Sequence, residues 1–325
     1  MVLSNNTKGQ FMNPQEAYEK AHDGKITWTE AIEIFKKDPE IALAHSRKIG
    51  RFLEAEEYLK DDADHSYNYA LQTRDRFELG EPAISTDQSI AYRYAIEVLR
   101  DRFPIAEPSF SKSAEYGYRY ALCVLRQRWE DAESAISQDA QYAYQYAKDV
   151  LKDRFPMAES VILKDDRISY LYAKDVIKGR WSEAEENIKK SYLFAYSYAK
   201  DVVKGRWTEA EESIKKNIST AYEYARYVIR GRFLEAEDKI MKSLVYAHEY
   251  VDNVVKGRWV EGENSFLNGK KKAMEYCIRY NVRLPEEHHN KVVAEVAMGG
   301  SNIKNYNLKR TYMRFVNTYK LAGVK

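Results

Sequence analysis

An arginine followed by tryptophan or phenylalanine recurs along almost the whole chain at a nearly constant interval. A glutamate follows each of these arginines by five residues, the first interval is 25 residues and the other seven are 26. The arginines are Arg51, Arg76, Arg102, Arg128, Arg154, Arg180, Arg206, Arg232 and Arg258, and the acids are Glu56, Glu81, Glu107, Glu133, Glu159, Glu185, Glu211, Glu237 and Glu263. A fixed period of this length predicts a repeat array, although it does not name a binding target.

Each repeat contains two helical stripes, here illustrated by residues 180–205. The first stripe has spacing i, i+3, i+4, i+7, and the second has spacing i, i+3, i+4, i+7, i+8, both typical of one face of a helix. The first comprises Trp181, Ala184, Glu185 and Ile188, and the second Ala195, Tyr198, Ala199, Val202 and Val203. We call the predicted helices A and B. One hairpin cannot bury its own apolar face, so we expect an all-α solenoid of about ten hairpins, wound as a right-handed superhelix.

The end of helix B carries a glycine in four repeats. Gly179, Gly205, Gly231 and Gly257 stand where a left-handed C-cap is expected. Asp75, Asp101, Gln127 and Asp153 occupy the same place elsewhere, and we expect weaker caps there.

The period divides the chain into three parts. Residues 1–50 form an N-terminal capping region with one degenerate repeat that starts at Trp28. Residues 51–282 hold nine hairpins, and residues 283–325 hold a degenerate repeat and a basic C-terminal cap or tail. Decayed terminal repeats are expected because the ends of a solenoid must present a polar surface.

Composition narrows the setting of this 325-residue chain. It has no apolar run long enough for a membrane helix, no basic-then-apolar leader and two scattered cysteines, Cys123 and Cys277. These features favour a reducing, cytoplasmic location without membrane contact. The net charge is +2, but residues 291–325 carry +6, so the remainder sums to −4.

The repeated arginine and glutamate are predicted to be structural partners. The glutamate lies four residues after the aromatic residue on the inward face, where an ionised carboxylate needs a partner. We therefore expect Arg180 to pair with Glu185, and Arg206 with Glu211, in buried or semi-buried positions. The alternative is a row of arginines that bind anions or nucleotides.

A Tyr-x-Tyr pair marks helix B in seven repeats. The second tyrosine lies on the apolar stripe and is predicted to be core, whereas the first lies at its edge and could line a groove. The residue between them varies, which fits either a graded binding surface or an unconstrained one. The candidate partner-binding residues are Tyr92, Arg93, Tyr118, Arg119, Tyr144, Tyr196 and Tyr222. Bases could stack on such a ladder, but the array lacks the charge to neutralise phosphates.

No motif indicates catalysis. The six histidines form no spaced ligand set, and His288 with His289 offers at most a weak metal site. We find no phosphate loop, dinucleotide fingerprint or nucleophile elbow, so we predict no enzyme activity, no cofactor and no metal.

The string Tyr-Ala-x-Asp-Val-(Val/Ile)-Lys-Gly-Arg-Trp-x-Glu-Ala-Glu, at 172–185 and 198–211, resembles tandem repeats of proteins from tailed bacteriophages and other large viruses. The resemblance covers about residues 51–264 and implies a phage origin, hence a host-cell cytoplasm. It carries no activity and no functional residues. Tetratricopeptide and Sel1-like repeats are similar in kind only, since their unit is longer.

Two functions follow from these patterns. The first is a non-enzymatic scaffold that binds a host or virion protein through the solenoid surface. The second is nucleic-acid binding by the C-terminal segment, where basic and aromatic residues alternate. Its candidate residues are Lys304, Lys309, Arg310, Tyr312, Arg314 and Lys320. In the structural alternative, the same segment is a helix that caps the last repeat through its aromatic residues.

Overall fold

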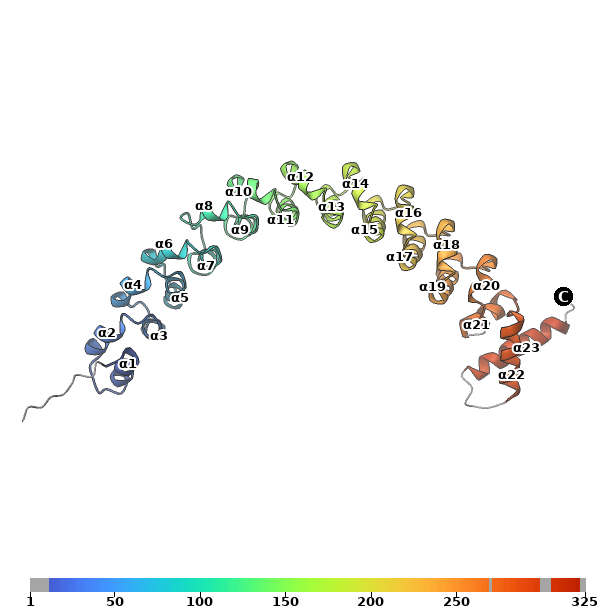
Figure 1. Cartoon of the computed structure of the whole chain (residues 1–325), viewed down its shortest axis with the longest axis horizontal. Coiled ribbons are helices and arrows are strands. Elements are labelled where there is room, and N and C mark those ends of the chain that lie inside the picture. Colours follow the sequence, from blue (N-terminus) through green and yellow to red (C-terminus); the bar gives the residue numbers. More distant parts are fainter. Residues whose placement is uncertain (1–11, 269–270, 299–304, 322–325) are drawn as a thin grey trace, which may run out of the picture. The chain divides into compact units, whose positions relative to one another are not determined.

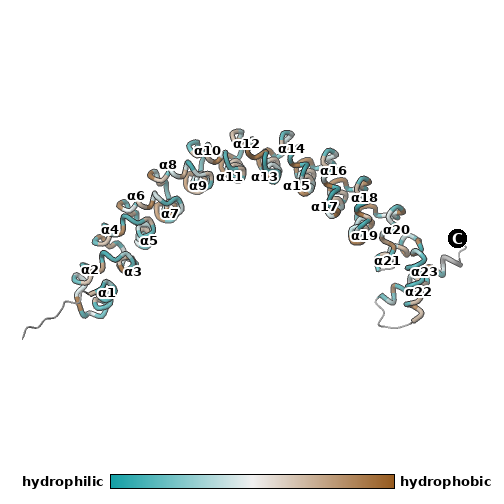
Figure 2. Tube along the Cα trace, viewed as in Figure 1, coloured by the Kyte–Doolittle hydropathy of each residue, from teal (hydrophilic) through white to brown (hydrophobic). Residues whose placement is uncertain are grey.

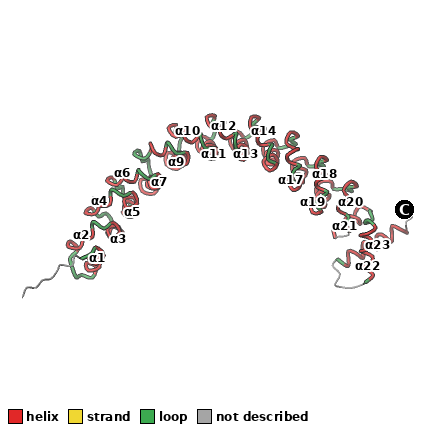
Figure 3. Tube along the Cα trace, in the orientation of Figure 1, coloured by secondary structure: helices red, strands yellow, loops and turns green. Residues whose placement is uncertain are grey.

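The computed structural model describes residues 12–268, 271–298 and 305–321, and within them every regular element is helical (Figures 1 and 3). Helical hairpins follow one another along the chain, which confirms the predicted all-α solenoid. Its handedness stays a prediction. The helices group into two compact units, residues 1–162 and 163–325, which are described separately. None of the described helices is both long and apolar enough to cross a membrane.

The first unit contains three helices before Arg51 and the hairpins that follow. The elements are α1 (Pro14–His22), α2 (Trp28–Phe35), α3 (Pro39–Ile49), α4 (Leu53–Leu59), α5 (Ala63–Thr73), η1 (Glu78–Gly80), α6 (Glu81–Ile84), α7 (Gln88–Tyr94), η2 (Ala95–Leu99), α8 (Glu107–Phe110), α9 (Ala114–Tyr120), η3 (Ala121–Leu125), α10 (Glu130–Ile136), α11 (Ala140–Tyr146), η4 (Ala147–Leu151) and α12 (Pro156–Ile162).

The second unit continues the pattern and ends in three longer helices. Its elements are α13 (Asp166–Tyr172), η5 (Ala173–Ile177), α14 (Ser182–Ile188), α15 (Tyr192–Tyr198), η6 (Ala199–Val203), η7 (Thr208–Ala210), α16 (Glu211–Ile214), α17 (Ile218–Glu223), η8 (Tyr224–Ile229), α18 (Leu234–Ile240), α19 (Leu244–Tyr250), η9 (Val251–Val255), η10 (Val260–Gly262), α20 (Glu263–Phe266), α21 (Lys271–Tyr280), α22 (Glu286–Ala297) and α23 (Tyr306–Leu321).

Helix B begins at a polar N-cap in the first eight hairpins. The side chain of Ser191, for example, accepts a hydrogen bond from the Phe194 N–H at the start of α15. Such a bond satisfies one of the backbone donors that the first helical turn leaves free. The same role falls to Asp62, Asp87, Ser113, Asp139, Asp165, Asn217 and Ser243.

The core follows the predicted stripes for most of their length, and apolar and polar stretches alternate within each hairpin (Figure 2). Ala184, Ile188 and Tyr198 are fully buried. The second tyrosine of each pair is confirmed as core, since the seven from Tyr69 to Tyr224 are almost completely buried, as is Tyr250 at the same place in the next repeat. Val202 and Val203 are only half-buried, so the predicted stripe on helix B ends one turn early.

A π-helical turn explains both the early end of the stripe and the change of period from 25 to 26. In the 25-residue repeat the Arg74 N–H bonds the carbonyl of Ala70, four residues back. In the next repeat the Arg100 N–H bonds Ala95, five residues back. The extra residue is therefore absorbed between the core tyrosine and the end of helix B, as a π-bulge absorbs an insertion.

The left-handed residue at the end of helix B is basic. Eight residues adopt φ between 50° and 58° here: Arg74, Arg100, Arg126, Lys152, Lys178, Lys204, Arg230 and Lys256. The predicted glycine caps are therefore wrong, because each left-handed position lies one residue earlier. A basic side chain at this end of a helix interacts favourably with the helix dipole, but a side chain in this conformation costs about 1–2 kcal/mol.

Candidate functional site

Each repeat encloses a hydrogen-bonded network built on its arginine. Arg180 donates from Nε and Nη2 to the two carboxylate oxygens of Glu185, both at 2.7 Å. The Tyr198 hydroxyl donates to Glu185 Oε1 at 3.0 Å and accepts from the Trp181 N–H at 2.7 Å. Equivalent networks surround Arg51, Arg76, Arg102, Arg128, Arg206, Arg232 and Arg258.

The structure brings Arg180 together with Glu185, and Arg206 with Glu211, within single repeats. The Glu185 and Glu211 side chains are 15% and 10% exposed, whereas Arg180 and Arg206 are 52% and 43% exposed. The carboxylate is thus nearly buried while the guanidinium remains open to solvent on one side. Because each guanidinium already holds a carboxylate bidentately, a row of anion-binding arginines is disfavoured.

The network moves its pKa values away from neutral. Hydrogen bonds from Arg180 lower the pKa of Glu185, and the same bonds raise the pKa of Arg180. Burial raises the pKa of Tyr146 to about 12 in the equivalent network. General acid–base catalysis needs a group that titrates near the operating pH, so these shifts argue for a structural role.

The first tyrosine of each pair joins successive repeats. Tyr118 donates to Asp149 at 2.8 Å, and Tyr170 donates to Asp201 at 2.5 Å. The expectation that these rings line an open groove is therefore corrected. Tyr118, Tyr144, Tyr196 and Tyr222 are at most 9% exposed, and Tyr92 is half-buried with its ring centroid 5.9 Å from that of Tyr116.

Arg93 and Arg119, the two other candidate partner-binding residues, are exposed. Arg93 lies 3.5 Å from Glu97 and 4.6 Å above the Tyr67 ring. Arg119 lies 3.0 Å from Glu115. Both guanidinium groups are accessible to a partner but already carry an ion pair, which limits what a new contact would add.

Two candidate nucleic-acid-binding residues of the C-terminal segment, Lys309 and Tyr312, pack against the preceding helices. Tyr312 is buried, and its hydroxyl accepts from the Leu284 N–H at 2.9 Å, as the repeat tyrosines accept from the aromatic residue's N–H. Lys309 is 9% exposed and paired with Glu295. We therefore correct the expectation that Lys309 and Tyr312 contact nucleic acid.

Of the four remaining candidate residues for nucleic-acid binding, two have described side chains. Arg310 and Arg314 are exposed on α23. Lys304 lies outside the described residues, and so does the side chain of Lys320. The described part of α23 therefore contributes two accessible cations, and its other two described candidates pack against the preceding helices.

The ends of helices B differ in charge between the two units. We compare the six residues that precede the next repeat arginine in each helix B. Summed over four helices of the first unit, these segments contain five basic and five acidic residues. The second unit has seven basic and three acidic, a net charge of +4. The ranges are 70–75, 96–101, 122–127 and 148–153 in the first unit and 174–179, 200–205, 226–231 and 252–257 in the second.

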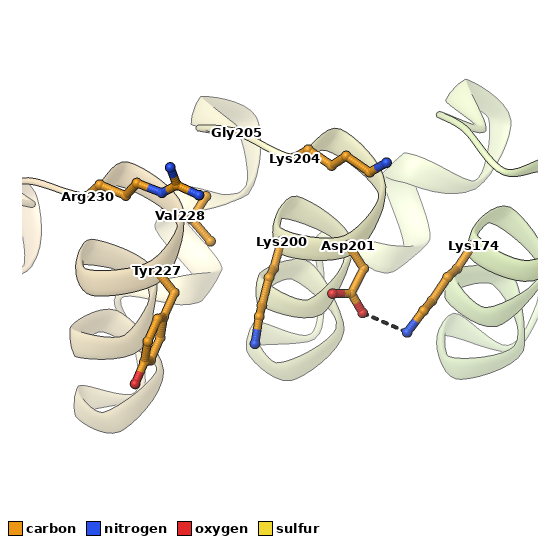
Figure 4. A pocket seen from close by; sticks show the side chains of 8 residues that line it. All are labelled: Lys174, Lys200, Asp201, Lys204, Gly205, Tyr227, Val228 and Arg230. Carbon is orange, nitrogen blue, oxygen red and sulfur yellow. Dashed lines mark hydrogen bonds and ion pairs between the residues drawn. The ribbon is translucent and has the colours of Figure 1, made fainter.

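An open hollow of about 600 Å³ lies among these basic ends in the second unit (Figure 4). Lys174, Lys200, Lys204 and Arg230 line it, and the acidic side chain in its lining is Asp201. Asp201 is itself bonded to Lys174 at 2.8 Å and to Tyr170. The hollow therefore has an excess of positive charge.

The first unit carries a row of exposed apolar side chains at the starts of helices A. Leu53, Leu79, Ile105 and Met157 are 65%, 51%, 50% and 59% exposed, and each follows its repeat arginine by two or three residues. Asp131 takes this place in the remaining repeat. We call these four side chains the apolar row. Exposed large apolar side chains that recur at the same place in successive repeats are candidates for an interaction surface.

The starts of helices A are also acidic. Over the seven residues that begin at each arginine from Arg51 to Arg154, five arginines stand against ten carboxylates, a net charge of −5. The exposed acids include Glu54, Glu78 and Glu130. The apolar row is thus bordered by negative charge.

Sequence reasoning missed the tyrosine hydroxyls and the basic caps. The constant spacing of 13 residues from glutamate to core tyrosine was the available signal for the hydroxyls. A lysine or arginine two residues before each repeat arginine from Arg76 to Arg258 was the signal for the caps. Across the described chain no group of three or more His, Cys, Asp and Glu residues could hold a metal ion.

No protein-family model, curated protein or solved structure matches the chain.

Proposed function

We propose that the protein is a non-enzymatic scaffold that binds another protein along the apolar row. The observation that supports this is the exposure of four large apolar side chains at the starts of helices A in four repeats. Each loses contact with water only if a partner covers it, and burial of such a side chain stabilises a complex by about 1.5–3 kcal/mol. A solenoid suits this role because it presents equivalent positions at regular intervals.

The charge around the apolar row specifies the partner's chemistry. A net −5 beside exposed leucine, isoleucine and methionine complements an amphipathic helix with an apolar face flanked by lysine or arginine. On the resemblance to phage repeats, we further propose that the partner is a host or virion protein met in the host cytoplasm.

The direct test uses two synthetic helical peptides, one of leucine and lysine and one of leucine and glutamate. Fluorescence anisotropy should show binding of the leucine–lysine peptide alone. A variant with Leu53, Leu79, Ile105 and Met157 all changed to Ser should lose at least tenfold in affinity.

A matched control changes to Ser four exposed apolar residues of the second unit that lie away from the starts of helices A: Tyr192, Leu193, Val245 and Met298. This control should bind as the wild type does. Equal loss in both variants, or unchanged binding in the apolar-row variant, would overturn the proposal. A host-lysate pull-down with the same three proteins then identifies a natural partner as one that the apolar-row variant alone fails to retain.

A further inference from the structure

The ends of helices B in the second unit form a second surface, chemically distinct from the apolar row. We propose that these basic ends bind the phosphate backbone of nucleic acid. The surface comprises Lys178, Lys200, Lys204, Arg230 and Lys256, which we call the cation row, with Lys200, Lys204 and Arg230 at the hollow of Figure 4.

The cation row differs from the repeat arginines in having no committed carboxylate. For the described part of the chain, none of its five members forms an ion pair, whereas every repeat arginine holds a glutamate. The nearby acids are occupied, since Asp201 binds Lys174 and Asp252 binds Arg279 at 2.9 Å. The positive charges of the cation row are therefore available to an external anion.

Backbone strain marks four of the five members of this row, as it marks the equivalent caps of the first unit. Lys178, Lys204, Arg230 and Lys256 all adopt positive φ, where glycine would be the less strained residue. A glycine follows each of them directly, yet the strained position itself is basic in all four repeats. Because the caps of both units share this strain, the feature that distinguishes the second unit is its net charge of +4 at the ends of helices B.

The surroundings favour nucleic acid over an acidic protein. A protein interface is centred on buried apolar anchors, but the apolar residues that reach this hollow are few, chiefly Tyr227 and Val228. Lysine side chains act as point charges that suit phosphates, and five cations distributed over four successive repeats match an extended polyanion. The half-exposed Tyr227 ring, 5.5 Å from Lys200 Nζ, offers an aromatic surface to a base.

The array's overall charge does not oppose this proposal. The chain outside residues 291–325 sums to −4, but the structure gathers +4 at the ends of helices B in the second unit and leaves the equivalent ends of the first unit neutral. Binding to phosphates depends on local charge within about one Debye length, roughly 10 Å at 0.1 M salt.

The test measures anisotropy of a fluorescein-labelled 30-nucleotide single-stranded DNA against the full chain over a series of salt concentrations. Each neutralised phosphate of a single strand contributes about −0.7 to the slope of log K against log salt, so the five cations of the row give about −3.5. A triple variant, Lys200→Ala, Lys204→Ala and Arg230→Ala, should reduce the slope by about 2 and weaken low-salt binding by at least tenfold.

The matched control is Arg100→Ala, Arg126→Ala and Lys152→Ala in the first unit, which removes the same total charge from left-handed cap positions. It should leave the slope unchanged, and circular dichroism should show both triple variants folded. Equal losses in the two variants, or no wild-type binding at 20 mM salt, would overturn the proposal.

The same anisotropy measurement with other anionic ligands distinguishes nucleic acid from acidic protein. Single-stranded RNA and duplex DNA of matched length establish which form binds best, and each should depend on the same three residues. A polyglutamate peptide of equal charge should bind at least tenfold more weakly than the single strand. If it binds as tightly, the row recognises acidic protein and the assignment to nucleic acid is wrong.

Discussion

Removal of one hydroxyl should test whether the repeat network stabilises the fold. In a Tyr198→Phe variant the ring and its packing persist, and only the hydroxyl is lost. That hydroxyl accepts from the buried Trp181 N–H at 2.7 Å and donates to Glu185 at 3.0 Å. No water can readily replace it, because the Tyr198 side chain is fully buried.

The magnitude follows from the two bonds. A buried N–H left without a partner costs about 1–3 kcal/mol, and a hydrogen bond to a charged group contributes about 1.5–3 kcal/mol. Glu185 keeps both bonds from Arg180, so the second loss is partial. We therefore expect local stability to fall by about 2–4 kcal/mol.

Amide hydrogen exchange is the appropriate assay, because a repeat array need not unfold as a single cooperative unit. A loss of about 2 kcal/mol or more should accelerate exchange at the Trp181 amide by roughly 30-fold or more, since about 1.4 kcal/mol corresponds to tenfold. Tyr192→Phe is the control, because the Tyr192 side chain is 42% exposed and should tolerate the change. If Trp181 exchanges at the same rate in wild type and both variants, the network does not stabilise the repeat.

Three further predictions concern titration, caps and thiols. Arg180 holds the pKa of Glu185 below its ordinary 4.5. The wild type should therefore exceed Glu185→Gln in free energy of unfolding by a full margin above pH 4.5, and that margin should shrink as the pH falls through the lower pKa of the folded state. Equal margins in denaturation experiments at pH 7 and pH 3 would contradict this. Arg126→Gly relieves a positive φ of 54° at about 1–2 kcal/mol but adds about 0.5–1 kcal/mol of chain entropy, so a net gain of about 0.5 kcal/mol is expected, and a lowered melting temperature would count against it. A thiol reagent should label exposed Cys123 at once but leave Cys277, which is fully buried with its pKa raised by burial to about 12. Tyr312→Ala should speed Cys277 labelling, because α23 packs on α21, and an unchanged rate would show that α23 does not protect this thiol.

The sequence predicted those features that depend on spacing within one helix. Trp181, Ala184 and Ile188 share a face at helical spacing, and Arg180 and Glu185 are close enough in the chain to meet in most hairpin geometries. The Tyr198 hydroxyl reaches Glu185 only because helix B folds back on helix A. The periodicity of a single helix therefore could not predict this contact across 13 residues.

The helix end was mispredicted for a similar reason. Gly205 is the residue that intrinsically prefers positive φ, and propensity alone assigns it the left-handed position. The π turn of η6 shifts that position to Lys204, because Lys204 N–H and Gly205 N–H both bond the carbonyl of Ala199. Such a turn depends on one extra residue, and helical periodicity counted at 3.6 residues per turn does not register it.

The closure of each Arg–Glu–Tyr network within a single repeat affects how such a gene can change. A duplicated or deleted block of 26 codons adds or removes a whole network and leaves every other one intact. Copy number can therefore drift without new core residues, and each added copy brings a fresh exposed position at the start of helix A and another at the end of helix B. Recombination between repeats could in this way lengthen a binding surface in steps of one hairpin.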